Sequence, residues 1–129
     1  MGKVTANNGK ENYFIELQTL TGNTILADEA VENGGQDKGF SPKELLESSL
    51  AACTSATVRL FAHRKGWHLK NVHIQVELME DNGKSTLNRK IFFDGSLDDE
   101  QRKTLLAVAN ACPVHKILTQ PIIIDTSVV

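Results

Sequence analysis

Apolar and polar residues alternate along several stretches of the chain, and this period of two is typical of half-buried β-strands. The alternation over residues 12–18 is followed by a turn at Gly22-Asn23 and then by a second apolar stretch. The clearest alternation covers residues 72–78, and a hairpin turn at residues 81–84 brings the chain back as a partner strand. We therefore expect strands at residues 3–7, 12–18, 24–27, 72–78, 87–93 and 121–124.

The strongest local signal is the start of a helix at Pro42. Ser41 and Glu44 have the spacing of a capping box, and proline suits the first helical position. No helix breaker follows until Gly66, so the pattern predicts a helix over residues 42–65, about 36 Å long. Its apolar stripe would consist of Leu46, Leu50, Cys53, Thr57 and Leu60.

Two further helices should follow the hairpin. Ser96, with Asp99 three residues later, predicts a capped helix over residues 97–111. Pro113 ends that helix because the residue before a proline avoids the α region. The same proline suits the first position of a short helix over residues 113–119.

Length and composition indicate one soluble α+β domain spanning residues 1–129. Hydrophobic residues make up 40% and charged residues 23%, which excludes a disordered chain. The net charge of −2, without a basic run, excludes nucleic acid and anionic membranes as partners. The sequence shows neither a membrane-spanning apolar stretch of about 20 residues nor a signal peptide. We therefore expect a cytoplasmic protein, where paired cysteines tend to be catalytic, redox-active or metal-bound.

Cys53 and Cys112 are the two cysteines of the chain and its best candidates for chemistry. A thiolate attacks a peroxide, and a second thiol converts the resulting sulfenic acid into a disulfide. Cys112 would lie at the start of the helix beginning at Pro113, where backbone N–H groups and the helix dipole lower the pKa of a thiol. Cys53 would lie in the middle of a helix and needs a cation from elsewhere.

Two inert arrangements of the cysteines compete with this hypothesis. Both could be buried and unreactive, since free cysteine is among the most buried residue types. They could also form a structural disulfide, worth about 4 kcal/mol for a loop of this length. A reducing cytoplasm argues against the disulfide.

The residues around both cysteines resemble the OsmC/Ohr family. The matching segments are Ser-Pro-Lys-Glu-Leu-Leu starting at Ser41, Leu-Ala-Ala-Cys-Thr around Cys53, and Ala-Cys-Pro-Val-His-Lys around Cys112. A cysteine eleven residues after a helix-starting proline, together with a later Cys-Pro, is a fairly specific combination, whereas Cys-Pro alone would be weak. The resemblance covers essentially the whole chain, including the order of strands and helices.

The resemblance implies a fold, an assembly and an activity. Family members form intertwined homodimers in which antiparallel strands wrap around long central helices. The best-known branches are thiol peroxidases that reduce organic hydroperoxides without a bound cofactor. On that resemblance, Cys53 is the peroxidatic thiol and Cys112 resolves it into an intramolecular disulfide. A small dithiol or a dithiol protein, often a lipoyl protein, then reduces the disulfide.

The chain departs from the Ohr branch at the pair of residues that activates the first cysteine. In that branch an arginine from the N-terminal strands serves it, held by a glutamate directly after the helix-starting proline. Here no arginine precedes Arg59, and Lys43 occupies the glutamate position. Lys10 and Lys43 are candidates for the missing charge. Glu44 is the candidate catalytic carboxylate, although it lies about 180° around the helix from the first cysteine and would have to serve a partner subunit.

Two other functions compete with the peroxidase. The missing arginine favours a non-catalytic OsmC-like protein that binds a small hydrophobic ligand in the dimer cleft. Cys112 and His115 also have a metal-ligand spacing, which His63, His68 and His73 could extend to a zinc site. We expect no metal, because no second close ligand pair exists. A more plausible role for His115 is to assist the ionisation of Cys112 or proton transfer.

Overall fold

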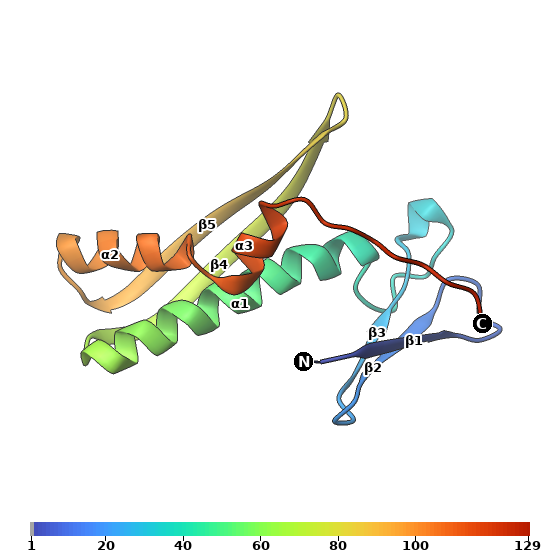
Figure 1. Ribbon diagram of the computed structural model, residues 1–129, viewed down its shortest axis with the longest axis horizontal. Helices are drawn as coiled ribbons and strands as arrows, with labels where there is room; N and C mark the ends of the chain where they lie inside the picture. The colour runs from blue at the N-terminus through green and yellow to red at the C-terminus, as the bar shows by residue number, and fades with distance from the viewer. Residues whose placement is uncertain (1) are drawn as a thin grey trace. The chain divides into compact units, whose positions relative to one another are not determined.

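The computed structural model describes residues 2–129 and contains strands, one 3-10 helix and α-helices (Figure 1). In chain order the elements are β1 (Val4–Asn8), β2 (Ile15–Thr19), β3 (Thr24–Ala27), η1 (Val31–Asn33), α1 (Pro42–Lys65), β4 (His68–Asp81), β5 (Lys84–Ser96), α2 (Asp99–Ala109) and α3 (Pro113–Leu118). The chain forms two compact units, the first ending at Leu46 and the second beginning at Glu47. The organisation as a single domain over residues 1–129 stays a prediction.

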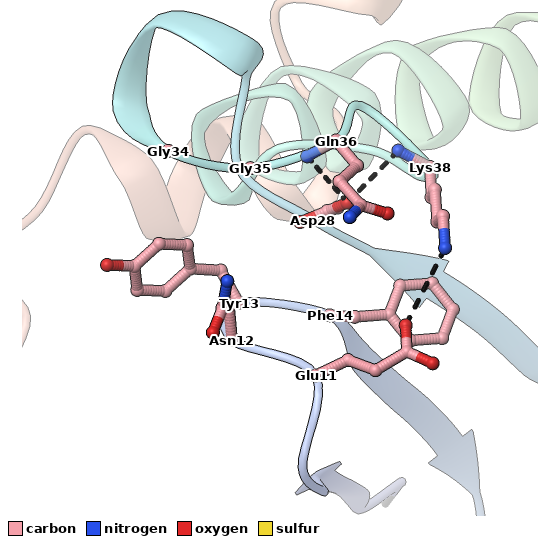
Figure 2. Close-up of a pocket in the computed structure, with 9 residues that line it drawn as sticks. All are labelled: Glu11, Asn12, Tyr13, Phe14, Asp28, Gly34, Gly35, Gln36 and Lys38. Atoms are coloured by element: carbon pink, nitrogen blue, oxygen red, sulfur yellow. Dashed lines mark hydrogen bonds and ion pairs between the residues drawn. The ribbon is translucent and has the colours of Figure 1, made fainter.

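The first unit contains an antiparallel sheet in the order β1-β2-β3. After β3 the chain closes a loop around Asp28, whose side chain is 3% exposed. Its carboxylate accepts the backbone N–H groups of Glu29, Gln36 and Lys38 at 2.8, 3.2 and 3.2 Å. Figure 2 shows the last two of these bonds converging on Asp28 beneath Gly35. A single buried carboxylate thus orders the whole loop.

Helix α1 starts and ends where local signals place it. The Ser41 hydroxyl accepts the N–H of Glu44 at 3.2 Å, while the Glu44 carboxylate accepts the N–H of Ser41 at 2.9 Å. At the other end Gly66 has a φ of 70°, a conformation that glycine adopts without strain. Trp67 N–H then bonds to the Ala62 carbonyl and Gly66 N–H to that of His63, which is a Schellman motif. The predicted helix over residues 42–65 is confirmed.

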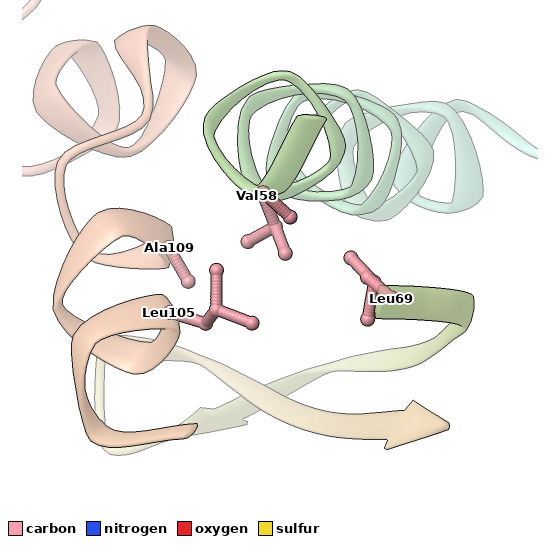
Figure 3. Packing of buried hydrophobic residues seen from close by; sticks show 5 residues of the cluster. Val58, Leu69, Leu105 and Ala109 are labelled. Carbon is pink, nitrogen blue, oxygen red and sulfur yellow. The ribbon is translucent and has the colours of Figure 1, made fainter. Parts of the chain in front are cut away.

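The second unit is built on the β4–β5 hairpin and an apolar core. Val58 of α1, Leu69 of β4, and Leu105 and Ala109 of α2 are all at most 6% exposed. Figure 3 shows their side chains pointing toward one another between the two helices and the hairpin. The turn of the hairpin is formed by Asn82 and Gly83, which both have positive φ.

The structure corrects two local predictions. The second helix begins at Asp99 rather than at residue 97, and Asp98, not Ser96, caps it with Gln101. Ser96 is not available as a cap because it still pairs with His68 in the hairpin. No strand forms over residues 121–124, since none of the strand pairings in residues 2–129 includes them. Ile123 and Ile124 are 92% and 85% exposed instead.

The α+β class with antiparallel strands and a long helix is confirmed. The intertwined homodimer stays a prediction. Within residues 2–129, no helix combines the length and the apolar character that crossing a membrane requires.

Candidate functional site

The fold brings Cys53 and Cys112 together although they are far apart in sequence. Cys53 lies in α1 and Cys112 is the N-cap of α3. Consecutive residues in the first turn of α3 serve both sulfurs: Val114 N–H donates to Cys53 Sγ, and His115 N–H donates to Cys112 Sγ, each at 3.4 Å. Both cysteines are free thiols, and the Cys53 side chain lies close enough to Cys112 to contribute to the lowering of its pKa.

The two thiols differ in their exposure to solvent. Cys112 is fully buried, whereas Cys53 is partly exposed. The Cys53 sulfur lies 4.0 Å from the hydroxyl of Thr57, one turn further along the helix. A reactant from solvent can therefore meet Cys53 but not Cys112.

The surroundings of Cys112 favour its thiolate. Burial raises the pKa of this thiol, because it disfavours the charged form. The N–H of His115, the hydroxyl of Thr54, the Cys53 thiol and the charge of Arg89 all lower it, and together they outweigh burial. The pKa of Cys112 is therefore below its ordinary value, as its position at the start of a helix led us to expect.

Arg89 of β5 supplies the positive charge at this site. Its guanidinium donates to Thr54 Oγ1 at 2.9 Å and to Asn110 Oδ1 at 2.8 Å. A third contact, 3.1 Å long, joins it to Nδ1 of His115. Arg89 thereby ties α1, α2 and α3 to the hairpin at the place where the two sulfurs meet.

The sequence prediction missed Arg89 because it sought the cation among the N-terminal residues. A usable signal was present in the alternation of β5. Arg89 shares a face with Leu87 and Ile91, while Asn88 and Lys90 point to solvent. A charged residue in the apolar phase of a strand is unusual and indicates a buried polar partner.

Comparison with known proteins identifies the family of this chain. The model of the family described as OsmC-like protein matches residues 35–127, which include both cysteines and Arg89. The chain belongs to the OsmC-like protein family. A comparison with curated proteins found no match.

Solved structures confirm the OsmC-like fold. An OsmC-like protein from Mycoplasma pneumoniae has a TM-score of 0.78 and 23% identity, over 92% of this chain and 87% of that one. The organic hydroperoxide resistance protein OhrB of Bacillus subtilis has a TM-score of 0.62 and 23% identity, over 91% and 89%. An organic hydroperoxide resistance protein OsmC from Legionella pneumophila has a TM-score of 0.66 and 20% identity, over 92% and 88%.

The third residue expected at the site, Glu44, has a structural role in this OsmC-like chain. Hydrogen bonds from the backbone and the hydroxyl of Ser41 lower the pKa of its carboxyl, and the side chain is exposed. The capping role of Glu44 at the start of α1 is therefore confirmed. Its catalytic role stays a prediction, as do the activating roles of Lys10 and Lys43.

The zinc alternative gains no support from the OsmC-like fold. Across residues 2–129, no three or more side chains of His, Cys, Asp or Glu come close enough to hold a metal ion. Of the four histidines, His115 is the one at the thiol site, where its backbone contacts Cys112 and its ring contacts Arg89.

Proposed function

We propose that this chain is a thiol peroxidase that reduces organic hydroperoxides, with Cys53 as the attacking thiol and Cys112 as the resolving thiol. The observation that carries the proposal is the contact between a partly exposed thiol and a fully buried one of lowered pKa. The printed names of the Bacillus subtilis and Legionella pneumophila proteins, both organic hydroperoxide resistance proteins, support the class of substrate.

The proposed cycle has two chemical steps before reduction. The Cys53 thiolate attacks the terminal oxygen of the hydroperoxide, the O–O bond breaks, and the alkoxide takes a proton to leave as an alcohol. Cys53 becomes a sulfenic acid. The Cys112 thiolate then attacks the Cys53 sulfur, forming the disulfide and releasing hydroxide, which becomes water. A dithiol, such as a lipoyl protein, would restore both thiols by exchange.

The proposed assembly is the homodimer that the family resemblance implies. In such a dimer Glu44 could act on the thiol pair of the partner subunit, and this is how its proposed catalytic role would be realised. The rival function, binding of a hydrophobic ligand without catalysis, was favoured by a missing cation. Arg89 supplies a cation on the Cys112 side of the thiol pair, so the site does contain a positive charge, although the arginine that serves the first cysteine in the Ohr branch has no counterpart among the N-terminal strands.

The decisive experiment counts free thiols before and after one equivalent of cumene hydroperoxide. The proposal expects the wild type to lose both thiols rapidly. In Cys112→Ser we expect a stable sulfenic acid on Cys53, trapped by a dimedone probe. Cys53→Ser should consume no peroxide and serves as the matched control.

Two results would contradict this proposal. One is a sulfenic acid on Cys112 in the Cys53→Ser variant that forms as fast as the wild type consumes peroxide. Cys112 would then be the attacking thiol and Cys53 the resolving one. Survival of both thiols in the wild type for minutes would exclude the peroxidase and leave the ligand-binding function as the alternative to test.

A further inference from the structure

Arg89 contacts two of the groups that hydrogen-bond to the sulfur of Cys112. One is the hydroxyl of Thr54, which receives an N–H of Arg89 at 2.9 Å and lies 3.8 Å from Cys112 Sγ. The other is His115, whose ring contacts Arg89 at 3.1 Å and whose N–H donates to the same sulfur at 3.4 Å. The guanidinium is therefore linked to the resolving thiol along two separate routes.

The hydrogen bonds of Arg89 leave its positive charge unneutralised. Arginine has no acceptor, so a hydrogen bond at this contact requires Nδ1 of His115 to be the acceptor. The other two partners are uncharged: the hydroxyl of Thr54 and the side-chain amide of Asn110. A thiolate on Cys112 would be a negative charge within the electrostatic reach of this guanidinium.

The hydroxyl of Thr54 can serve both protonation states of Cys112. A hydroxyl carries one proton and two acceptor sites. Arg89 occupies one acceptor site, and the proton can go to the Leu50 carbonyl at 2.7 Å. When Cys112 is protonated, its S–H can donate to the second acceptor site of the Thr54 hydroxyl. When Cys112 is ionised, the hydroxyl can rotate and donate its own proton to the Cys112 sulfur. Arg89 stays bound to Thr54 in either state.

We propose that Arg89 is a positioning residue for the second half of the cycle, holding Cys112 as the thiolate that attacks oxidised Cys53. This inference rests on the proposed peroxidase function. In the step concerned, the Cys112 sulfur attacks the sulfur of the Cys53 sulfenic acid, the S–S bond forms, the S–O bond breaks, and hydroxide leaves as water after taking up the proton that Cys112 released to solvent on ionising. Cys112 is oxidised and the Cys53 sulfur is reduced to the disulfide level. The cation of this chain thus serves the resolving thiol.

A titration without peroxide tests whether Arg89 holds the thiolate. In the Cys53→Ser background, the ultraviolet absorbance of the Cys112 thiolate is followed against pH with and without Arg89→Met. We expect Arg89→Met to move the midpoint to higher pH, and Arg89→Lys, which keeps the charge, to move it less. Arg102→Met is the matched control, because Arg102 also donates from a partly buried position to an uncharged acceptor, the Phe93 carbonyl.

The titration has two outcomes that would overturn the proposal. One is a curve for Arg89→Met that coincides with that of the Cys53→Ser parent. The other is an equal displacement by Arg102→Met, because the effect would then be a general result of losing an arginine. If Arg89→Met does not fold, Arg89→Gln, which also removes the charge but keeps a hydrogen-bond donor, takes its place and is judged in the same way.

Single-turnover kinetics with both cysteines present assign Arg89 to its step. Sulfenic acid formation on Cys53 and its conversion to disulfide are followed separately after a pulse of cumene hydroperoxide. At neutral pH we expect Arg89→Met to slow the conversion about tenfold, with recovery at higher pH, because an opposite charge at close range favours the attacking thiolate. The first step should change much less.

A slower first step with an unchanged second one would overturn the assignment. If the wild type forms no sulfenic acid, the proposed function fails, and with it the place of Arg89 in the cycle. The titration would still report whether Arg89 holds the Cys112 thiolate, so the two failures can be told apart.

Discussion

The two compact units of the chain are organised by different kinds of buried group. In the first unit, the buried residues among those described are Ala27 and Asp28, and the Asp28 carboxylate orders a loop through three backbone N–H groups. In the second unit an apolar cluster around Val58 and Leu105 fills the space between helices and hairpin. The thiol site lies in this second unit, where Thr54 and Cys112 are buried as well.

The comparison shows what each kind of burial can position. A carboxylate that accepts several N–H groups determines the path of a backbone segment, because each bond is directional. An apolar core holds whole elements at set distances and keeps water from the polar groups beside it. The close contact of the two sulfurs therefore depends on the core of the second unit.

The largest effect should come from truncating that core. Leu105→Ala removes a fully buried side chain, and we expect a loss of about 2–5 kcal/mol in the free energy of unfolding, measured by urea denaturation. The control is Leu106→Ala on the same helix, where the side chain is 52% exposed and the loss should be below about 0.5 kcal/mol. Equal losses in the free energy of unfolding for the two variants would contradict the conclusion that the apolar core holds the second unit together.

A methyl group at Gly35 should disturb the first unit. A Cβ there would lie 1.9 Å from the Glu29 carbonyl oxygen, so the backbone of the loop around Asp28 must shift. We expect Gly35→Ala to destabilise the protein by about 1–3 kcal/mol, with faster amide exchange at Gln36 and Lys38. Gly9→Ala meets no atom within 4 Å and is the matched control. If the amide hydrogens of Gln36 and Lys38 exchange as slowly in Gly35→Ala as in Gly9→Ala, Gly35 is not tightly packed against Glu29.

The buried carboxylate should make the stability of the chain depend on pH. Burial raises the pKa of Asp28, but three backbone hydrogen bonds and the charge of Lys38 outweigh it, so the pKa lies below its ordinary value of 3.8. The folded state therefore stabilises the ionised form of the Asp28 carboxyl. Its stabilising contribution is complete above the ordinary value and is lost as the pH falls through the lower folded value.

This pH dependence can be measured with Asp28→Asn. At neutral pH we expect the wild type to be more stable than the variant, with the difference shrinking in acid below pH 3.8. Asp125→Asn, in the exposed C-terminal segment, should show no such difference. A difference between wild type and Asp28→Asn that stays constant from neutral pH into acid would exclude the ionised carboxylate as the organiser.

The smallest effect is expected at the start of α1. Glu44→Gln keeps a hydrogen-bond acceptor for the Ser41 N–H and loses a negative charge near a helix N-terminus, which should cost about 0.5 kcal/mol. The peroxide reduction rate of the same variant decides whether Glu44 also acts in catalysis. A loss of rate far beyond the change in stability would establish that role, and an unchanged rate would restrict Glu44 to the helix cap.

Local patterns predicted most elements of the fold. The bounds of α1 follow from Ser41, Pro42 and Gly66, whose effects act within one turn of the chain. The hairpin follows from alternation and a turn. The expected strand over residues 121–124 was wrong because an apolar run becomes a strand only with a hydrogen-bonded neighbour.

The candidate site could be predicted only in part. Cys53 and Cys112 stood out through their number, their context and a family resemblance, but the cation did not. Arg89 reaches the thiols because β5 pairs with β4, with Arg89 opposite Val76, and turns its inner face toward α1 and α3. Neither strand pairing nor the packing of the hairpin on the helices is a local property of the residues around an arginine.

The sequence by itself determined where α1 begins and ends, which residues alternate in the hairpin, and which two residues carry thiols, because these depend on neighbours within a few residues. Only the tertiary structure decided that one thiol is partly exposed and the other buried, that Arg89 is the cation beside Cys112, and that Asp28 organises the first unit. Those features depend on burial and charge between residues distant in sequence, and these arise only when the chain is packed.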